Sequence, residues 1–152
     1  MLRVCELFSG IGAQSMALTI LGIEHESVAC DIDAAAHRSY CAIHGDTPNL
    51  GDITKLEHLP DCDLLTYSFP CQDLSIAGNK RGMKEGTGTR SSLLWEVGRL
   101  LADARGREPS TLLMENVDAI LNKKNIKEFR GGGSPCASSP PGRIRDGGGS
   151  VA

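Results

Sequence analysis

The 152-residue chain is predicted to be an α/β protein, with a parallel sheet covered by helices. Three observations predict this class. Short apolar runs alternate with longer segments of helical periodicity. A Gly-x-Gly turn separates the first run from the first helix. Aspartates follow two of the apolar runs, where the carboxyl ends of strands are expected. The length suits one domain with one hydrophobic core.

The first half of the chain supplies two strand and helix pairs. Residues 3–7 are a short apolar run and predict a strand, and residues 13–21 predict the helix after the glycine turn. Residues 27–30 predict a second strand that ends at Asp31. Residues 34–43 are rich in good helix formers and predict a second helix.

The second half repeats the alternation. Residues 63–67 predict a strand, and residues 91–104 predict an amphipathic helix. Residues 111–114 predict a further strand, and residues 117–121 begin another helix. The apolar face of the 91–104 helix is expected to consist of Leu94, Val97, Leu101 and Ala104.

The composition changes abruptly after residue 129. Gly, Pro and Ser supply 14 of the 23 residues from 130 to 152, and the apolar periodicity stops. We therefore expect residues 1–129 to form the domain and residues 130–152 to be a disordered tail. Out-of-frame translation explains the tail as well as a native linker does.

Charge and cysteine content narrow the class of protein. The net charge is −3 and only 4% of residues are aromatic, so the chain as a whole lacks the basic and stacking surfaces of nucleic-acid-binding proteins. The six cysteines are not at metal-binding spacing, and no long apolar segment predicts a membrane span. We expect an intracellular protein without a metal, in which Cys5, Cys30, Cys41 and Cys62 are buried and unreactive.

The glycine turn "LFSGIG" is the first candidate site. Gly10 and Gly12 allow a sharp turn and a close approach of a ligand, with a tight strand-to-helix turn as the alternative explanation. Ser15 stands where a dinucleotide fingerprint has its third glycine. Asp31 lies about twenty residues beyond the turn, where a carboxylate can bind ribose hydroxyls. With Asp52, it favours an adenosine-type cofactor, although each aspartate alone also suits a turn or a helix cap.

Two further segments carry candidate catalytic groups. Cys71 follows Pro70 at the end of a predicted strand, a suitable position for a nucleophilic thiolate, with a buried structural cysteine as the alternative. Glu115 ends another strand, where a partly buried carboxylic acid with a raised pKa can donate a proton, although a glutamate near a helix start is the simpler interpretation. The Gly-, Lys- and Arg-rich stretch 78–90 predicts a mobile loop that contacts phosphates or is merely solvated.

The segments "ELFSGIG", "FPCQ" and "LLMENV" follow one another at separations that resemble the DNA cytosine-5 methyltransferase family. The resemblance covers about residues 1–129. It implies a Rossmann-like S-adenosylmethionine-dependent methyltransferase fold, here incomplete. It also implies transfer of a methyl group from S-adenosyl-L-methionine to C5 of cytosine in DNA. One branch of this family acts on tRNA, so an RNA substrate is the close variant.

The resemblance also assigns roles to residues. Cys71 becomes the nucleophile that forms a covalent adduct at C6, and Glu115 the acid that assists at N3. Phe8 is expected beside the adenine, Asp31 on the ribose, and Asp52 at the edge of the base. The full set expected to bind the cofactor is Phe8, Ser9, Gly10, Gly12, Asp31, Ile32, Asp52, Ile53 and Pro70.

The chain lacks other parts of the family pattern. A Gln-x-Arg-x-Arg-type motif, a target recognition domain and a late cofactor motif are not found, and Arg143 and Arg145 lack the context of that motif. We therefore expect weak or no binding of double-stranded DNA and no activity without a complementing C-terminal chain. The alternatives are a non-catalytic truncated fragment, a cofactor-binding partner subunit, and a nicotinamide-dependent enzyme. The first motif lies close to Met1, which suits a cytoplasmic prokaryotic or phage enzyme.

Overall fold

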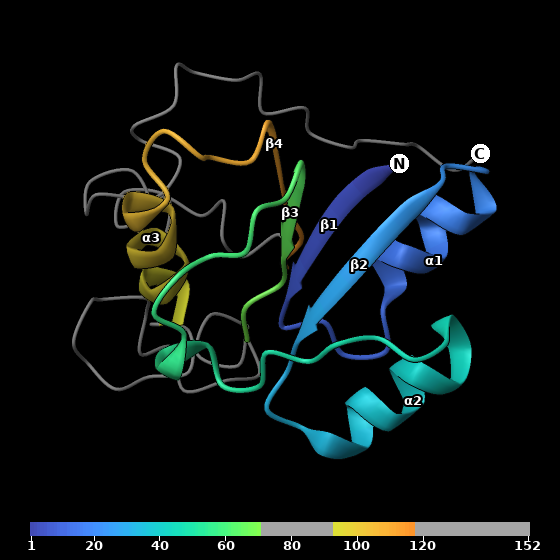
Figure 1. The fold of residues 1–152 in the computed structure, drawn as a ribbon. Coiled ribbons are helices and arrows are strands. Elements are labelled where there is room, and N and C mark those ends of the chain that lie inside the picture. The colour runs from blue at the N-terminus through green and yellow to red at the C-terminus, as the bar shows by residue number, and fades with distance from the viewer. Residues whose placement is uncertain (71–92, 118–152) are drawn as a thin grey trace.

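The computed structural model describes residues 1–70 and 93–117, and these form an α/β unit with a parallel sheet, as predicted (Figure 1). The elements are β1 (Leu2–Leu7), α1 (Ala13–Ile20), β2 (His25–Cys30), α2 (Ala34–His44), the 3₁₀ turn η1 (Ile53–Lys55), β3 (Leu64–Tyr67), α3 (Leu94–Asp103) and β4 (Thr111–Met114). The tail, the 78–90 loop, residues 91–92 and most of the 117–121 helix lie outside the described residues.

The strand order is β2-β1-β3-β4, and every neighbouring pair is parallel. The chain crosses the sheet in one direction from β1 to β2 and in the opposite direction from β3 to β4. Because parallel crossovers are right-handed, helices α1 and α3 must then lie on opposite faces of the sheet. Figure 1 shows α3 on one side and α1 with α2 on the other.

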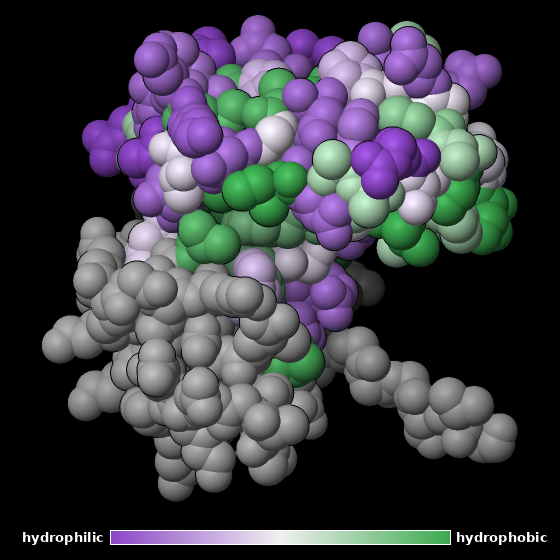
Figure 2. All heavy atoms as spheres, turned by 90° about the horizontal axis from the view of Figure 1, so that it is seen from below, coloured by the Kyte–Doolittle hydropathy of each residue, from purple (hydrophilic) through white to green (hydrophobic). Residues whose placement is uncertain are grey.

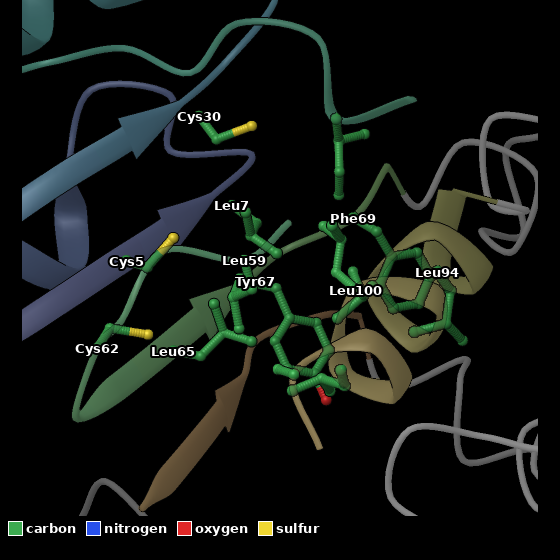
Figure 3. Close-up of a cluster of buried hydrophobic side chains, with 14 residues drawn as sticks. Cys5, Leu7, Cys30, Leu59, Cys62, Leu65, Tyr67, Phe69, Leu94 and Leu100 are labelled. Atoms are coloured by element: carbon green, nitrogen blue, oxygen red, sulfur yellow. The ribbon is translucent and has the colours of Figure 1, made fainter. Parts of the chain in front are cut away.

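The main hydrophobic core lies between the sheet and α3 (Figure 3). Alternation along β1 directs Cys5 and Leu7 to this face, where they meet Leu65 and Tyr67 of β3. The predicted apolar face of α3 is confirmed, since all four of its residues are buried: Leu94, Val97, Leu101 and Ala104. Burying each of the larger side chains contributes about 1.5–3 kcal/mol. This core holds the carboxyl ends of the strands, and so the loops after them, in fixed positions.

The opposite face of β1 is not wholly apolar, and here the sequence-based description of residues 3–7 as an apolar strand is incomplete. Glu6 is fully buried, and its Oε1 accepts hydrogen bonds from the hydroxyls of Ser15 and Tyr40. The Ser15 hydroxyl also lies 2.8 Å from that of Ser27 on β2. Buried polar groups need such partners, so this cluster fixes α1 and α2 against the sheet.

The expected burial of the cysteines holds for Cys5, Cys30 and Cys62, whereas Cys41 on α2 is only half-buried. Burial, with the charges of Asp31 and Asp52, raises the pKa of Cys30 to about 12, so this thiol is neutral at physiological pH. A hydrogen bond with the Cys62 thiol and burial raise the pKa of Cys5 well above its ordinary range.

Candidate functional site

Most of the predicted site residues lie in loops that begin where the strands end, at one edge of the sheet. The register aligns Cys30, Leu7, Tyr67 and Met114, the last residues of the four strands. Because all strands are parallel, the loops after them leave from the same edge of the sheet, the carboxyl edge. Figure 2 views the molecule from below Figure 1, the side toward which the β1 and β2 arrowheads point. Ligands of open α/β sheets bind at this edge, where the strand order reverses, here between β1 and β3.

The loop after β1 has an unusual backbone. Phe8 adopts a φ of 59°, a conformation that residues with a side chain rarely take, and Gly10 follows with a φ of 55°. The amides of Phe8 and Ser9 both donate to the Cys30 carbonyl, at 2.8 and 3.2 Å. A Cβ added to Gly10 would meet no atom of the described residues within 4 Å. Among the described residues, none therefore fills the space above Gly10, which a ligand could occupy.

Gly12 serves a different purpose from Gly10. It has a φ of 81° and caps α1, and a Cβ there would lie 2.5 Å from both His44 Nε2 and Tyr40 Cε2. The glycine thus permits α2 to pack against the start of α1. The structural explanation considered for the motif fits Gly12, whereas the ligand-binding explanation fits Gly10.

Asp31 links the loop after β2 to the glycine loop. Its Oδ2 accepts from the Gly10 amide at 2.8 Å, and its Oδ1 accepts from the Asp33 amide at 2.9 Å. Each carboxylate oxygen can accept a further hydrogen bond. The neighbouring Ile32 side chain is 77% exposed, which leaves an apolar surface beside the carboxylate.

Asn49 is a residue of this region that sequence analysis missed. Its carboxamide hydrogen-bonds the backbone of Asp31 and the amide of Gly51. The segment around it forms an isolated parallel bridge to Ala29 beside β2. Its only sequence signal is its position ahead of "GDIT", which is too slight to single it out.

Asp52 and Ile53 begin the short turn η1. Asp52 Oδ1 accepts from the Thr54 amide at 3.0 Å and from its hydroxyl at 2.8 Å, which is the capping role considered for this residue. These hydrogen bonds hold the pKa of Asp52 below its ordinary value, so it is ionised at neutral pH. Ile53 is buried in the core and 4% exposed, so it offers little surface to a ligand.

The ends of β3 and β4 are tied together beyond the sheet. The Asn116 side-chain amide donates to the Phe69 carbonyl at 2.9 Å, and the Glu115 backbone amide donates to the Tyr67 carbonyl at 3.1 Å. The segment that ends at Phe69 is therefore held beside Glu115. Pro70, which precedes Cys71 in the sequence, follows this segment directly. The Glu115 side chain is exposed rather than partly buried. Cys71 itself lies outside the described residues.

The polar and apolar groups around the glycine loop fit an adenosine-type cofactor. The Ser9 hydroxyl is buried yet has no hydrogen-bond partner among residues 1–70 and 93–117. Asp31 presents carboxylate lone pairs, Ile32 presents apolar surface, and the space over Gly10 is open. A ligand with both hydroxyls and a flat apolar ring would satisfy this combination of groups.

A cavity of about 380 Å³ lies elsewhere, among side chains of α1, β2, α2 and the segment after α2. Its polar lining includes Ser15 and Tyr40, whose hydroxyls already donate to Glu6. The carboxyl edge remains the candidate site, because the residues that could bind a cofactor or react with a substrate lie there.

The fold is that of methyltransferases. The structure resembles the crystal structure of the S. pombe Dnmt2 methyltransferase with a TM-score of 0.65 and 29% identity, over 86% of this chain and 38% of that one. It also resembles the Entamoeba histolytica methyltransferase EhMeth with a TM-score of 0.64 and 19% identity, over 85% of this chain and 42% of that one. The second likeness concerns the fold alone.

The sequence identifies the family. A model of C-5 cytosine-specific DNA methylases matches residues 2–131, and the chain belongs to that family. The orphan methyltransferase M.SssI of Spiroplasma monobiae is 55% identical over 53% of this chain and 22% of its own length. M.Rho11sI of Bacillus phage rho11s is 40% identical over 80% of this chain and 24% of its own. The type II methyltransferase M2.ScrFI of Lactococcus lactis subsp. cremoris is 31% identical over 85% of this chain and 51% of its own.

The chain spans between 22% and 51% of the length of these curated relatives. S-adenosyl-L-methionine is the methyl donor that the family and fold imply, which favours it over a nicotinamide cofactor. The relatives come from bacteria and phages. Among the helices that the structure describes, none has both the length and the hydrophobicity to cross a bilayer.

Proposed function

We propose that this chain binds S-adenosyl-L-methionine at the carboxyl edge and supplies the nucleophile for methylation of cytosine C5 in DNA. The observation that carries the proposal is the shared edge. The open glycine loop with Asp31 lies on one side of the strand reversal, and the Pro70 and Glu115 ends lie on the other. A cofactor and a base would thereby meet over adjacent strands.

The proposed cofactor pose uses residues of two loops. Asp31 would accept hydrogen bonds from the ribose hydroxyls while it retains its bonds to the loop amides. Phe8 and Ile32 would pack on the adenine, with Asp52 at its edge. Ser9 and Gly10 would approach the polar end of the cofactor, and the cofactor supplies an electrophilic methyl group there.

The proposed chemistry is covalent and begins at Cys71. Its thiolate would form a bond to C6 of the cytosine, which makes C5 nucleophilic enough to take the methyl group. The sulfonium of S-adenosyl-L-methionine would lose that methyl group and leave as S-adenosyl-L-homocysteine. Loss of the C5 proton to solvent then re-forms the ring double bond and expels the thiolate. Glu115, exposed at the end of β4, would hold a proton at N3 as charge develops on the ring.

We also propose that the chain needs a complementing chain to transfer methyl groups. It has a net charge of −3 and spans at most 51% of the relatives named above. Binding to duplex DNA depends on neutralising phosphates with basic side chains, so affinity of the chain alone should be poor. The target must also leave the base stack, which requires further protein contacts.

A methyl-transfer assay tests this proposal. The chain is mixed with the part of M.SssI that it does not span, labelled S-adenosylmethionine and duplex DNA, with tRNA as a second substrate. We expect label in DNA cytosine only from the mixture, with loss in Cys71→Ser and retention in the matched control Cys41→Ser. Transfer that survives Cys71→Ser contradicts the covalent mechanism, transfer to tRNA alone contradicts the substrate, and activity of the unmixed chain contradicts the need for a partner.

The second candidate function is that of a cofactor-binding module without turnover. The acidic net charge favours it. In that case S-adenosylmethionine binds, but no mixture transfers the methyl group.

A further inference from the structure

Asn49 lies between the two loops that the proposed function assigns to the nucleoside of the cofactor. It follows α2 and precedes Gly51 and Asp52, in a segment that runs beside β2. The backbone on either side of it pairs with one residue of that strand: the Ala29 amide donates to the Pro48 carbonyl at 2.9 Å, and the Leu50 amide donates to the Ala29 carbonyl at 2.8 Å. These bonds place the Asn49 side chain beside Asp31.

Within the part of the chain that the structure describes, the Asn49 carboxamide makes three hydrogen bonds, and all of them go to backbone groups of these loops. Its Oδ1 accepts from the Asp31 amide and from the Gly51 amide, each at 3.0 Å. Its Nδ2 donates to the Asp31 carbonyl at 3.0 Å. One side chain therefore holds Asp31 by both its N–H and its C=O, and holds the residue before Asp52 as well.

We propose that Asn49 is a positioning residue, which fixes the carboxylate of Asp31 for the ribose hydroxyls and couples it to the Asp52 loop. The inference rests on the proposed cofactor site. Asn49 acts through backbone, whereas Asp31 reaches the glycine loop with its own side chain. Hydrogen bonds from Asn49 to Asp31 and from Asp31 to Gly10 thus join the loops after β1 and β2 to the loop that carries Asp52.

The residue type matters because the site needs one acceptor for two amides and one donor for a carbonyl. A carboxamide supplies both from two separate atoms of a planar group, whereas an ionised aspartate supplies acceptors only. An aspartate would also add a negative charge beside Asp31. A glutamine has the right groups but an extra methylene, which displaces them from backbone groups at fixed positions.

Isothermal titration of the full chain with S-adenosyl-L-homocysteine and its 2′,3′-dideoxy analogue tests the role. For Asn49→Ala we expect binding of S-adenosylhomocysteine to weaken about three- to tenfold, as expected for the loss of one or two hydrogen bonds. Binding of the dideoxy analogue should change less, because it lacks the groups that Asp31 is positioned to bind. The preference of the chain for the ribose hydroxyls therefore shrinks.

Thr47→Ala is the matched control. The Thr47 hydroxyl donates to the Gly45 carbonyl at 3.2 Å within the same segment, away from Asp31. It should leave both affinities and the preference unchanged. Asn49→Gln serves as a second variant should Asn49→Ala lose its thermal unfolding transition, and it should show the same reduced preference.

The outcomes separate the inference from the proposed function. Equal weakening for both ligands indicates a merely structural role and overturns the inference, as does unchanged affinity in Asn49→Ala. A wild-type chain that binds neither ligand contradicts the proposed function, and the inference falls with it. If the preference for the ribose hydroxyls is reduced in Asn49→Ala and Asn49→Gln but unchanged in Thr47→Ala, the result supports the inference and the proposed function.

Discussion

The two glycines of the turn after β1 should respond differently to the same substitution. Both have a positive φ, 55° at Gly10 and 81° at Gly12. Alanine at either position therefore costs roughly 1–2 kcal/mol of backbone strain. It also gains the same small stabilisation from a less flexible unfolded chain. The difference between the two variants isolates what the added methyl group touches.

At Gly12 the methyl group would lie 2.5 Å from the Tyr40 ring and from His44 Nε2. Neither neighbour moves freely. The Tyr40 ring is fully buried and its hydroxyl donates to Glu6 at 2.5 Å, and His44 Nε2 lies 3.1 Å from the Ile11 carbonyl. Overpacking of this kind costs about 1–3 kcal/mol. At Gly10 the methyl group meets no atom of residues 1–70 and 93–117 within 4 Å.

Denaturant unfolding of the two variants measures the difference. We expect Gly12→Ala to be less stable than Gly10→Ala by about 1–3 kcal/mol, the overpacking cost alone. We also expect Gly10→Ala, but not a folded Gly12→Ala, to lose affinity for S-adenosylmethionine, because its methyl group enters the open space of the site. Equal stabilities of the two variants would refute the assignment of Gly12 to helix packing.

Two further predictions concern buried and paired acids. Tyr40→Phe removes a donor from the buried Glu6 carboxylate and should lower the free energy of unfolding by about 1–3 kcal/mol in a denaturant titration, and an unchanged midpoint would contradict the Glu6 cluster. Arg3 lies 2.8 Å from Asp63, and its hydrogen bonds lower the pKa of Asp63 to about 2 from 3.8. Because this pKa is depressed on folding, the stabilisation is present above pH 4 and is lost as the pH falls through 2. The stability difference between wild type and Asp63→Asn should therefore disappear on acidification over that range, and a difference that is constant with pH would contradict the pairing.

Much of the fold was predictable because the strands are apolar and the apolar residues recur at helical spacing between them. The last strand was predicted to the residue at Thr111–Met114, and the ends of the first three strands, at Leu7, Cys30 and Tyr67, were also correct. Helices α1 and α2 begin at the predicted residues Ala13 and Ala34. The last residues of α1, α2 and α3 each differ from the prediction by one residue, as is usual where capping and fraying decide them. Alternating patterns indicate which residues face inward, but they do not give strand order, which only tertiary pairing decides.

The parts that could not be predicted depend on contacts between distant residues. Glu6 reads as an interruption of an apolar strand, and its burial is explained only by hydroxyls of residues 15 and 40. Asn49 appears unremarkable until the chain brings it beside Asp31. The different purposes of Gly10 and Gly12 likewise become visible only when α2 is in place. The catalytic roles of Cys71 and Glu115 stay predictions.

Calorimetric titration of S-adenosylmethionine into the full chain measures directly whether the carboxyl edge binds the cofactor. The wild type is compared with Asp31→Ala and with Asp46→Ala, an exposed carboxylate after α2 that serves as the matched control. We expect saturable binding that Asp31→Ala abolishes and Asp46→Ala retains. Absence of binding to the folded wild-type chain, or binding that survives Asp31→Ala unchanged, would contradict a cofactor site at this edge.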